Sequence, residues 1–238
     1  MIARNSGEGS DRSAGKGDYL LSDDEEANLK LLGQNFENVV VVLNVGGIID
    51  TKFFDEIDGL DSMLLMSQAG QEGGNALVKV LNGTANPSGK LTDTWPVNFD
   101  DNPSSEGFAN QDGNTAQELY NDDIFVGYRY YDTFGVDVSY PFGYGGSYTS
   151  FAMSTKSVKA DKDKVTVQVK VKNTGIVSGK EVAEVYFSAP DGELDKPYQE
   201  LAGYAKTDEL APGEFQILTI SFDTKEMGSY DTDKAAYV

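Results

Sequence analysis

The 238-residue sequence predicts an α/β region built on a mostly parallel sheet, followed by an all-β sandwich. Two continuous apolar runs, at 39–43 and 63–66, are typical of strands buried on both faces of a parallel sheet. Beyond Phe151 the pattern becomes an alternation with period two, and four valines mark one buried face of an antiparallel strand: Val165, Val167, Val169 and Val171. We therefore expect one domain over residues 1–145 and a second over 146–238.

A first helix is predicted before the first apolar run. Ser22 and Glu25 have the spacing of a capping box, in which the serine caps the helix and the glutamate reaches back to it. Leu29, Leu32 and Phe36 recur at helical spacing, so we expect them to form the buried stripe of this helix.

Two further helices are expected in the α/β region. Residues 53–57 predict a short helix between the two apolar runs, and this order implies a right-handed crossover. Glycines at 70, 73 and 74 predict a sharp turn into another helix, which ends at Gly83. Four of its apolar residues share one face: Ala76, Leu77, Val80 and Leu81.

The middle of the chain is first polar and then aromatic. Residues 97–123 predict a long surface loop, and 125–131 predict an aromatic strand. Tyr128, Tyr130 and Tyr131 have two interpretations, a platform for stacking a sugar or ordinary core packing, and core packing is favoured because aromatic side chains mostly serve cores. Further sandwich strands are expected where apolar residues alternate: Ala183, Val185, Phe187, Leu218, Ile220 and Phe222.

The composition narrows the classes of function. With 39 acidic and 19 basic residues the formal charge is −20, which disfavours nucleic-acid and membrane-surface partners. The sequence contains no cysteine and no histidine, so thiolate metal sites and a histidine general base are excluded and acid–base chemistry falls mainly to carboxylates. No apolar run approaches the roughly 20 residues of a membrane span, and the compartment stays open between cytoplasmic and secreted.

Gly46 and Gly47 follow the first apolar run and raise the alternative of a dinucleotide-binding loop. The G-x-G-x-x-G spacing of that motif is absent, which disfavours the alternative. We expect neither a cofactor nor a metal.

Six motifs follow one another along the chain: S-G-E-G-S-D-R at 6–12, G-Q-E-G-G-N-A at 70–76, N-P-S-G-K-L at 86–91, T-W-P at 94–96, F-V-G-Y-R-Y-Y-D at 125–132 and Y-P-F-G-Y-G at 140–145. In this order they resemble the C-terminal part of glycoside hydrolase family 3, the β-glucosidase family. The resemblance implies a partial C-terminal α/β sandwich domain over 1–145 and a fibronectin type III-like domain over 146–238. In the family the fibronectin type III-like domain normally has one more strand, beyond the position of Val238, and we expect this sequence to lack it. We also expect the family's neighbouring (β/α)8 barrel to lie outside this sequence.

The resemblance implies a role for Glu8, which taken alone has the features of a solvated surface carboxylate. In the family branch with S-G-E-G-x-D-R this glutamate is the general acid/base, offered to a site on the barrel. Retaining hydrolysis needs a second carboxylate about 5 to 5.5 Å away as the nucleophile, and in the family the barrel supplies it. We therefore expect no nucleophile in this chain, and we expect β-glucosides or oligosaccharides to bind through the barrel.

The sequence also departs from the family pattern in places. Ser67, Thr92 and Gly146 stand where Trp, Pro and Leu are common. Glu72 is a second conspicuous carboxylate, but the resemblance implies that its motif is structural and shapes the start of a helix.

The sequence is therefore compatible with two functions. The first is the C-terminal part of a retaining β-glucosidase, inactive by itself, and the alternative is a non-catalytic accessory or carbohydrate- or protein-interaction module. The DNA upstream of Met1 discriminates between them: an open frame that continues into a barrel supports the first, and a genuine start codon supports the second.

Overall fold

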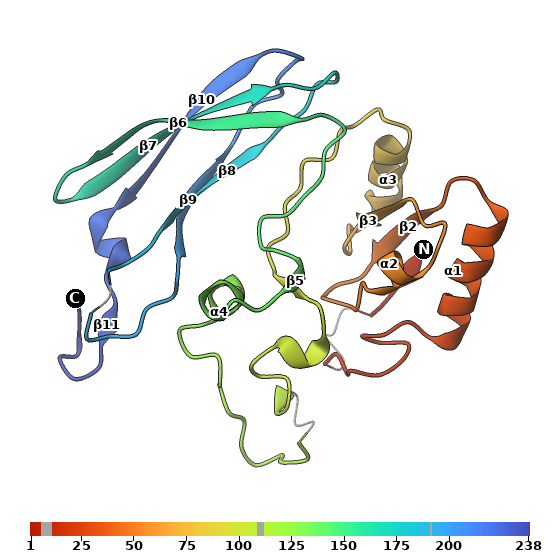
Figure 1. The fold of residues 1–238 in the computed structure, drawn as a ribbon, viewed down its shortest axis with the longest axis horizontal. Coiled ribbons are helices and arrows are strands. Elements are labelled where there is room, and N and C mark those ends of the chain that lie inside the picture. Colours follow the sequence, from red (N-terminus) through yellow and green to blue (C-terminus); the bar gives the residue numbers. More distant parts are fainter. Residues whose placement is uncertain (6–10, 109–111, 191) are drawn as a thin grey trace. The chain divides into compact units, whose positions relative to one another are not determined.

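The computed structural model describes residues 1–5, 11–108, 112–190 and 192–238 (Figure 1). These residues form two compact units. The first unit comprises Met1–Asn82, Asp93–Asp123 and Asp137–Pro141, and the second comprises Gly83–Thr92, Ile124–Val136 and Phe142–Val238. Among the described residues, no helix is long and apolar enough to cross a membrane.

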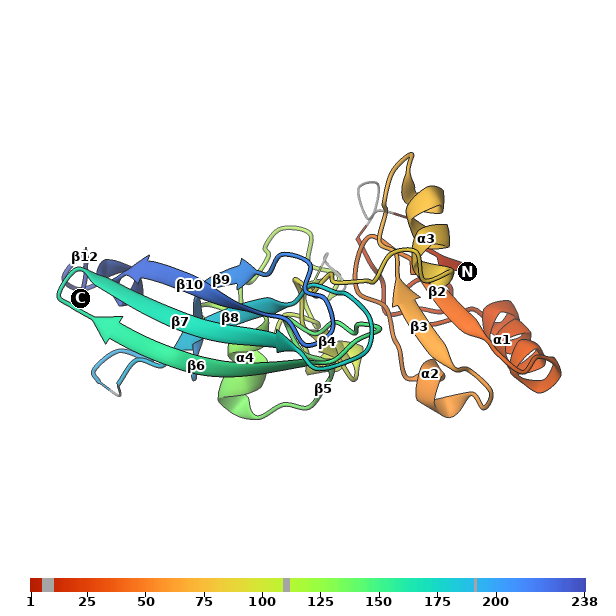
Figure 2. The same ribbon diagram turned by 90° about the horizontal axis from the view of Figure 1, so that it is seen from above.

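A three-stranded parallel sheet in the order β1-β2-β3 forms the centre of the first unit, with three helices around it (Figures 1 and 2). β1 (Ile2–Ala3) pairs with the end of β2 (Val40–Asn44), and β2 pairs along its length with β3 (Ser62–Leu65). The parallel sheet that the apolar runs predict is thereby confirmed. Val41, Val42 and Leu43 are buried at consecutive positions, as in a strand covered on both faces.

β3 is less buried than its apolar sequence predicts. Ser62 is exposed and the three following residues are only half-buried. The reason is its place at the edge of the described sheet, where no further strand pairs with it.

The helix α1 (Asp23–Asn35) begins with the predicted capping box. The Glu25 backbone N–H donates to the Ser22 hydroxyl, and the Ser22 backbone N–H donates to the Glu25 carboxylate at 2.9 Å. The predicted buried stripe is wrong after its first member, because Leu29 is buried whereas Leu32 and Phe36 are 39% and 61% exposed.

Gly33 explains how the second half of α1 packs instead. A Cβ built on Gly33 would lie 2.2 Å from the Asp58 carbonyl oxygen, and one on Gly59 would lie 2.5 Å from the Gly33 carbonyl oxygen. Backbone therefore meets backbone at this point, and the apolar side chains of this half of the helix are left at the surface.

The remaining predicted helices of the first unit are confirmed as α2 (Phe53–Glu56) and α3 (Gly73–Leu81). α3 follows Gly70, which has a φ of 69°, and is followed by Gly83, which has a φ of 75°. The stretch after α3 adds the antiparallel pair β4 (Trp95–Pro96) and β5 (Val138–Tyr140) and the short helix η1 (Phe99–Asp101).

The second unit contains the predicted antiparallel sandwich. One sheet has the order β10-β7-β6, formed by β6 (Phe151–Ala160), β7 (Lys164–Asn173) and β10 (Phe215–Asp223); the other pairs β8 (Val182–Phe187) with β9 (Glu200–Lys206). The four alternating valines of β7 are all buried, as predicted, and they share one core cluster with Ala183, Leu210, Leu218, Ile220 and Phe222. The unit ends with the 3-10 helix η3 (Thr224–Met227) and the short pair β11 (Tyr230–Asp231) and β12 (Ala236–Tyr237).

The aromatic strand predicted over 125–131 is wrong, because the chain forms the helix α4 (Tyr128–Phe134) there. Gly127 precedes the helix with a φ of 59°, and Gly135 ends it in the left-handed conformation. Tyr131 is buried, and the Tyr128 hydroxyl accepts a hydrogen bond from the Leu201 N–H at 2.7 Å. These tyrosines therefore pack within the second unit.

Two segments of the expected first domain, Gly83–Thr92 and Ile124–Val136, belong to the second unit together with the sandwich. Polar contacts join the first of these segments to the sandwich. The Lys90 ammonium lies 2.7 Å from the Glu181 carboxylate, and the Lys206 ammonium donates to the Ser88 carbonyl oxygen at 2.7 Å. The expected domain limits, 1–145 and 146–238, stay a prediction.

Candidate functional site

The predicted site segment leaves the sheet directly after β1. Parallel strands place their carboxyl ends at one edge, where α/β proteins commonly bind ligands. Glu8 itself, with the rest of 6–10, lies outside the described residues. The residues on either side of it are described, and they define how the segment begins and ends.

Arg4 holds the beginning of this segment. Its backbone N–H donates to the Asn44 carbonyl oxygen at 3.1 Å, next to the last residue pair of β1 and β2. Its guanidinium donates to both carboxylate oxygens of Glu25, at 2.7 and 2.8 Å, and Nε donates to the Asp18 carbonyl oxygen at 2.7 Å. The Arg4 side chain is 5% exposed and the Glu25 side chain 26%, so this bidentate, charge-assisted pair is largely shielded from water.

Arg12 holds the end of the segment. Its Nη1 donates to Asp18 Oδ1 at 2.6 Å, while the Ser13 backbone N–H and hydroxyl donate to Asp18 Oδ2 at 2.7 and 3.0 Å. Arg12 also reaches the loop after β2, since a Cβ built on Gly47 would lie 3.7 Å from its Nη2. Gly47, one of the two glycines that raised the dinucleotide alternative, therefore lies beside an arginine of this chain.

The two carboxylates in this network are held as anions. Burial raises the pKa of Asp18, but the hydrogen bonds from Ser13 and Arg12 together outweigh burial and bring the pKa below its usual value. The hydrogen bonds from Arg4 are the main cause of the lowered pKa of Glu25, and burial opposes them only in part. Both groups are therefore suited to holding arginines and unsuited to donating protons at neutral pH.

The loop after β3 carries the second conspicuous carboxylate. Ser67 has a φ of 53° in this loop, a conformation that costs energy for a residue other than glycine. Glu72 occupies the N-cap position of α3, is exposed, and accepts a hydrogen bond from the Asn75 side chain at 2.7 Å. The structural role that the resemblance implies for Glu72 stays a prediction.

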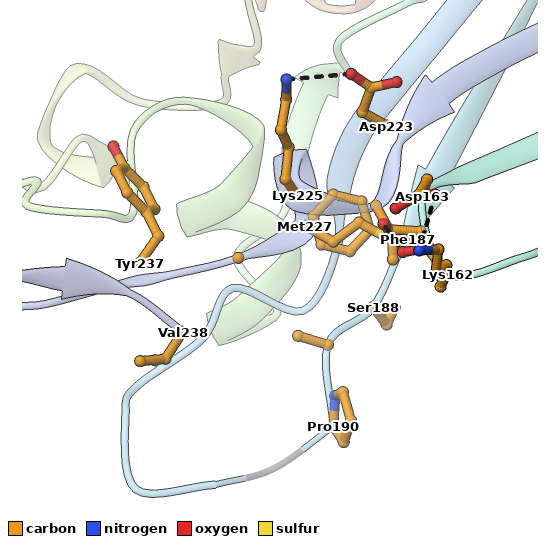
Figure 3. A pocket seen from close by; sticks show the side chains of 13 residues that line it. Lys162, Asp163, Phe187, Ser188, Pro190, Asp223, Lys225, Met227, Tyr237 and Val238 are labelled. Carbon is orange, nitrogen blue, oxygen red and sulfur yellow. Dashed lines mark hydrogen bonds and ion pairs between the residues drawn. The ribbon is translucent and has the colours of Figure 1, made fainter.

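A cavity of about 780 Å³ lies in the second unit, between the loop after β8 and the end of the chain (Figure 3). Its apolar walls include Phe187 and Met227. Its charged groups pair with their neighbours, Lys225 with Asp223 at 3.2 Å and Lys162 with Asp163 at 3.7 Å. It brings together none of the predicted site residues. Across the described part of the chain, no group of three or more His, Cys, Asp or Glu side chains is arranged to hold a metal ion.

Sequence reasoning missed the arginine network. The sequence pattern predicts only a capping role for Glu25, although the same carboxylate also binds Arg4, 21 residues away. Helical and strand periodicity cannot reveal such a pair. The available signal was the presence of one arginine before the glycine-rich motif and one at its end, because each buried arginine requires an anion.

Comparison with known proteins identifies relatives along nearly the whole chain. The family model of the glycosyl hydrolase family 3 C-terminal domain matches residues 1–148, and that of the fibronectin type III-like domain matches 181–238. A β-glucosidase of Ruminococcus albus is 45% identical over 232 residues, which are 97% of this chain and 24% of the relative. β-Glucosidase A of Butyrivibrio fibrisolvens is 42% identical, with 90% of this chain and 28% of the relative covered.

A solved structure agrees with the sequence comparison. β-Glucosidase 3B from Thermotoga neapolitana, in complex with α-D-glucose, matches with a TM-score of 0.90 and 43% identity over 97% of this chain and 32% of that chain. This chain thus spans about a quarter of the length of the curated relatives named above. The chain belongs to glycoside hydrolase family 3, and it contains the C-terminal domain of that family together with a fibronectin type III-like domain.

Proposed function

We propose that this chain is the C-terminal part of a retaining β-glucosidase and that Glu8 is its general acid/base. The observation that carries the proposal is the position of the S-G-E-G-S-D-R motif, directly after β1 in a family 3 C-terminal domain. The names of the relatives support the substrate class, since the proteins most similar to this chain include β-glucosidases from several organisms.

The proposed reaction has two steps. In the first, the protonated Glu8 gives its proton to the glycosidic oxygen while a carboxylate of the barrel attacks the anomeric carbon, so that the leaving alcohol departs neutral. In the second, the Glu8 carboxylate takes a proton from water, which attacks the same carbon and releases the sugar with retained configuration.

The chain by itself is not proposed to be active. The nucleophile and most of the sugar pocket belong to the barrel, so we expect no hydrolysis of aryl β-glucosides by the purified chain. Activity is therefore tested in a chimera, in which this chain replaces the matching segment of the Thermotoga neapolitana enzyme.

Glu8→Gln in the chimera tests the role of Glu8. Hydrolysis of cellobiose should fall by about 10² to 10⁴-fold, the usual contribution of a positioned acid or base. A dinitrophenyl glucoside needs no proton to depart, so its first step should be nearly unchanged and the covalent intermediate should accumulate as a burst. Azide needs no general base, so it should restore turnover and give a β-glucosyl azide.

Glu72→Gln is the matched control, because it makes the same change at an exposed carboxylate that follows β3. It should show no dependence on the leaving group. If Glu8→Gln slows all substrates equally, without a burst and without a response to azide, Glu8 is not the acid/base. A folded chimera with no activity at all would instead favour the non-catalytic interaction module.

A further inference from the structure

We infer that Asp18 and Glu25 are positioning residues for Glu8, acting through Arg12 and Arg4. This inference rests on the proposed function of Glu8 and goes further, because it names the groups that set the place of the acid/base. The contacts that support it are made by the described residues on either side of 6–10.

The geometry ties both ends of the motif segment to one short stretch of chain. Arg4, before the motif, binds the Asp18 carbonyl oxygen and the Glu25 carboxylate. Arg12, the last residue of the motif, binds the Asp18 carboxylate. Asp18 therefore contacts both arginines, one through its backbone and the other through its side chain.

The anchoring stretch is itself fixed in the first unit. Tyr19 and Leu21 are buried, and the Tyr19 carbonyl oxygen accepts a hydrogen bond from the Asp50 N–H at 2.9 Å. Glu25 lies in the first turn of α1 and takes part in its capping box. A displacement of either arginine would thus have to break shielded ion pairs or move the start of a helix.

Other ion pairs near α1 lack these features. Lys16–Asp23 and Lys30–Glu26 join side chains that are 43% to 80% exposed, and such pairs contribute little to stability. In the pairs Arg4–Glu25 and Arg12–Asp18 the arginine side chains are 5% and 14% exposed and the carboxylate side chains 26% and 29%. The shielded pairs are those that bracket the motif, which is the arrangement expected if they fix its ends.

Fixing the ends matters for the chemistry because a general acid works only within hydrogen-bond reach of the oxygen it protonates. A misplacement of about 1 Å can reduce the rate about 10²-fold. Loss of either ion pair, Arg4–Glu25 or Arg12–Asp18, should therefore weaken proton donation by Glu8 while leaving substrate binding by the barrel unchanged.

The test uses Glu25→Gln and Arg12→Lys in the same chimera. Each variant should lower kcat on cellobiose by about 10- to 100-fold, with little change in KM, and should affect the first step on the dinitrophenyl glucoside less than twofold. Arg12→Lys keeps the charge and loses the guanidinium fork, so it separates positioning from simple electrostatics. Glu26→Gln is the matched control, since it makes the same change one residue away in an exposed pair, and it should leave every rate unchanged.

A double change shows whether the anchor acts through Glu8. In the Glu8→Gln background, Glu25→Gln should cause no further loss on cellobiose, because there is no longer a proton donor to position. An additional 10-fold loss there would overturn the inference, and so would equal slowing of all substrates or loss of folding in both anchor variants. If Glu8→Gln itself lacks the leaving-group signature, the proposed function fails; if it shows the signature and the anchor variants do not, only this inference fails.

Discussion

In the second unit the buried side chains alternate along β7 and β10, whereas in the first unit they are consecutive in β2 and continue into the loop after it. The sandwich core is formed by strands that each cover one face. The first unit also buries Val45, Ile49 and Thr51, which follow β2 at the carboxyl edge of the sheet. The edge that carries the candidate site is therefore part of the core in the first unit, and changes there affect folding as well as chemistry.

The largest expected effect tests whether the first unit has a core of its own. Leu43 is 1% exposed at the end of β2, so Leu43→Ala should lower the free energy of unfolding of this unit by about 3 kcal/mol. Trp95, the single tryptophan, is buried in the first unit, and its fluorescence during denaturation reports that unit. Leu31→Ala, at a site 59% exposed, is the control and should change the free energy of unfolding of the first unit by less than about 0.5 kcal/mol. Equal shifts of the Trp95 signal and of the β-sheet circular dichroism would show that the units unfold as one.

A smaller effect is expected from a polar group in the second unit. Asn173 is fully buried at the end of β7, where its amide donates to the Val177 and Leu210 carbonyl oxygens, at 2.8 Å each, and accepts from the Thr149 hydroxyl. Asn173→Ala leaves these partners unsatisfied and should cost about 2 kcal/mol in the circular dichroism transition.

The same change should leave the Trp95 transition where it was, because the contacts of Asn173 lie within the second unit. Lys172→Ala, at the exposed neighbour, is the control and should stay within about 0.5 kcal/mol. A shift of the Trp95 transition by Asn173→Ala would contradict the separation of the two cores.

The smallest expected effects are two changes of opposite sign within the first unit. In an exposed helix, Gly→Ala stabilises by up to about 1 kcal/mol, and Gly74→Ala in α3 should do so because nothing lies within 4 Å of the added Cβ. Gly33→Ala in α1 should instead destabilise by about 1 kcal/mol, since the Asp58 carbonyl oxygen occupies that space. Both are read from the Trp95 transition, and stabilisation by Gly33→Ala would refute the backbone contact.

Local signals in the sequence predict much of the fold. The alternating valines of β7 and the Ser22–Glu25 capping box depend on neighbours within a few residues, and both are confirmed. The strand predicted over 125–131 is wrong because aromatic residues generally favour strands. The helix found there depends on Gly127, Gly135 and packing against a strand distant in sequence. The predicted burial of Leu32 and Phe36 is wrong because periodicity gives the apolar face of a helix and cannot show whether another element covers that face.

The candidate site was predictable to a smaller extent. A resemblance, not physics, singles out Glu8, since an isolated surface glutamate between glycines has no distinctive property. Its anchors escaped prediction because Arg4 and Glu25 are brought together only when the chain passes from β1 to the start of α1. Such pairs follow from the three-dimensional path of the chain and are read from the structure.

The anchoring of both arginines to one stretch has a consequence for exchanging parts between relatives. A segment that runs from Arg4 to Glu25 contains both arginines together with Asp18 and Glu25, which bind them. A transplant of this length should therefore fold with both ends of its motif held in place. A shorter graft that ends at Arg12 would depend on the recipient for an aspartate at the position of Asp18. Compatibility between donor and recipient should therefore be judged by the 22-residue unit 4–25 and not by the motif alone.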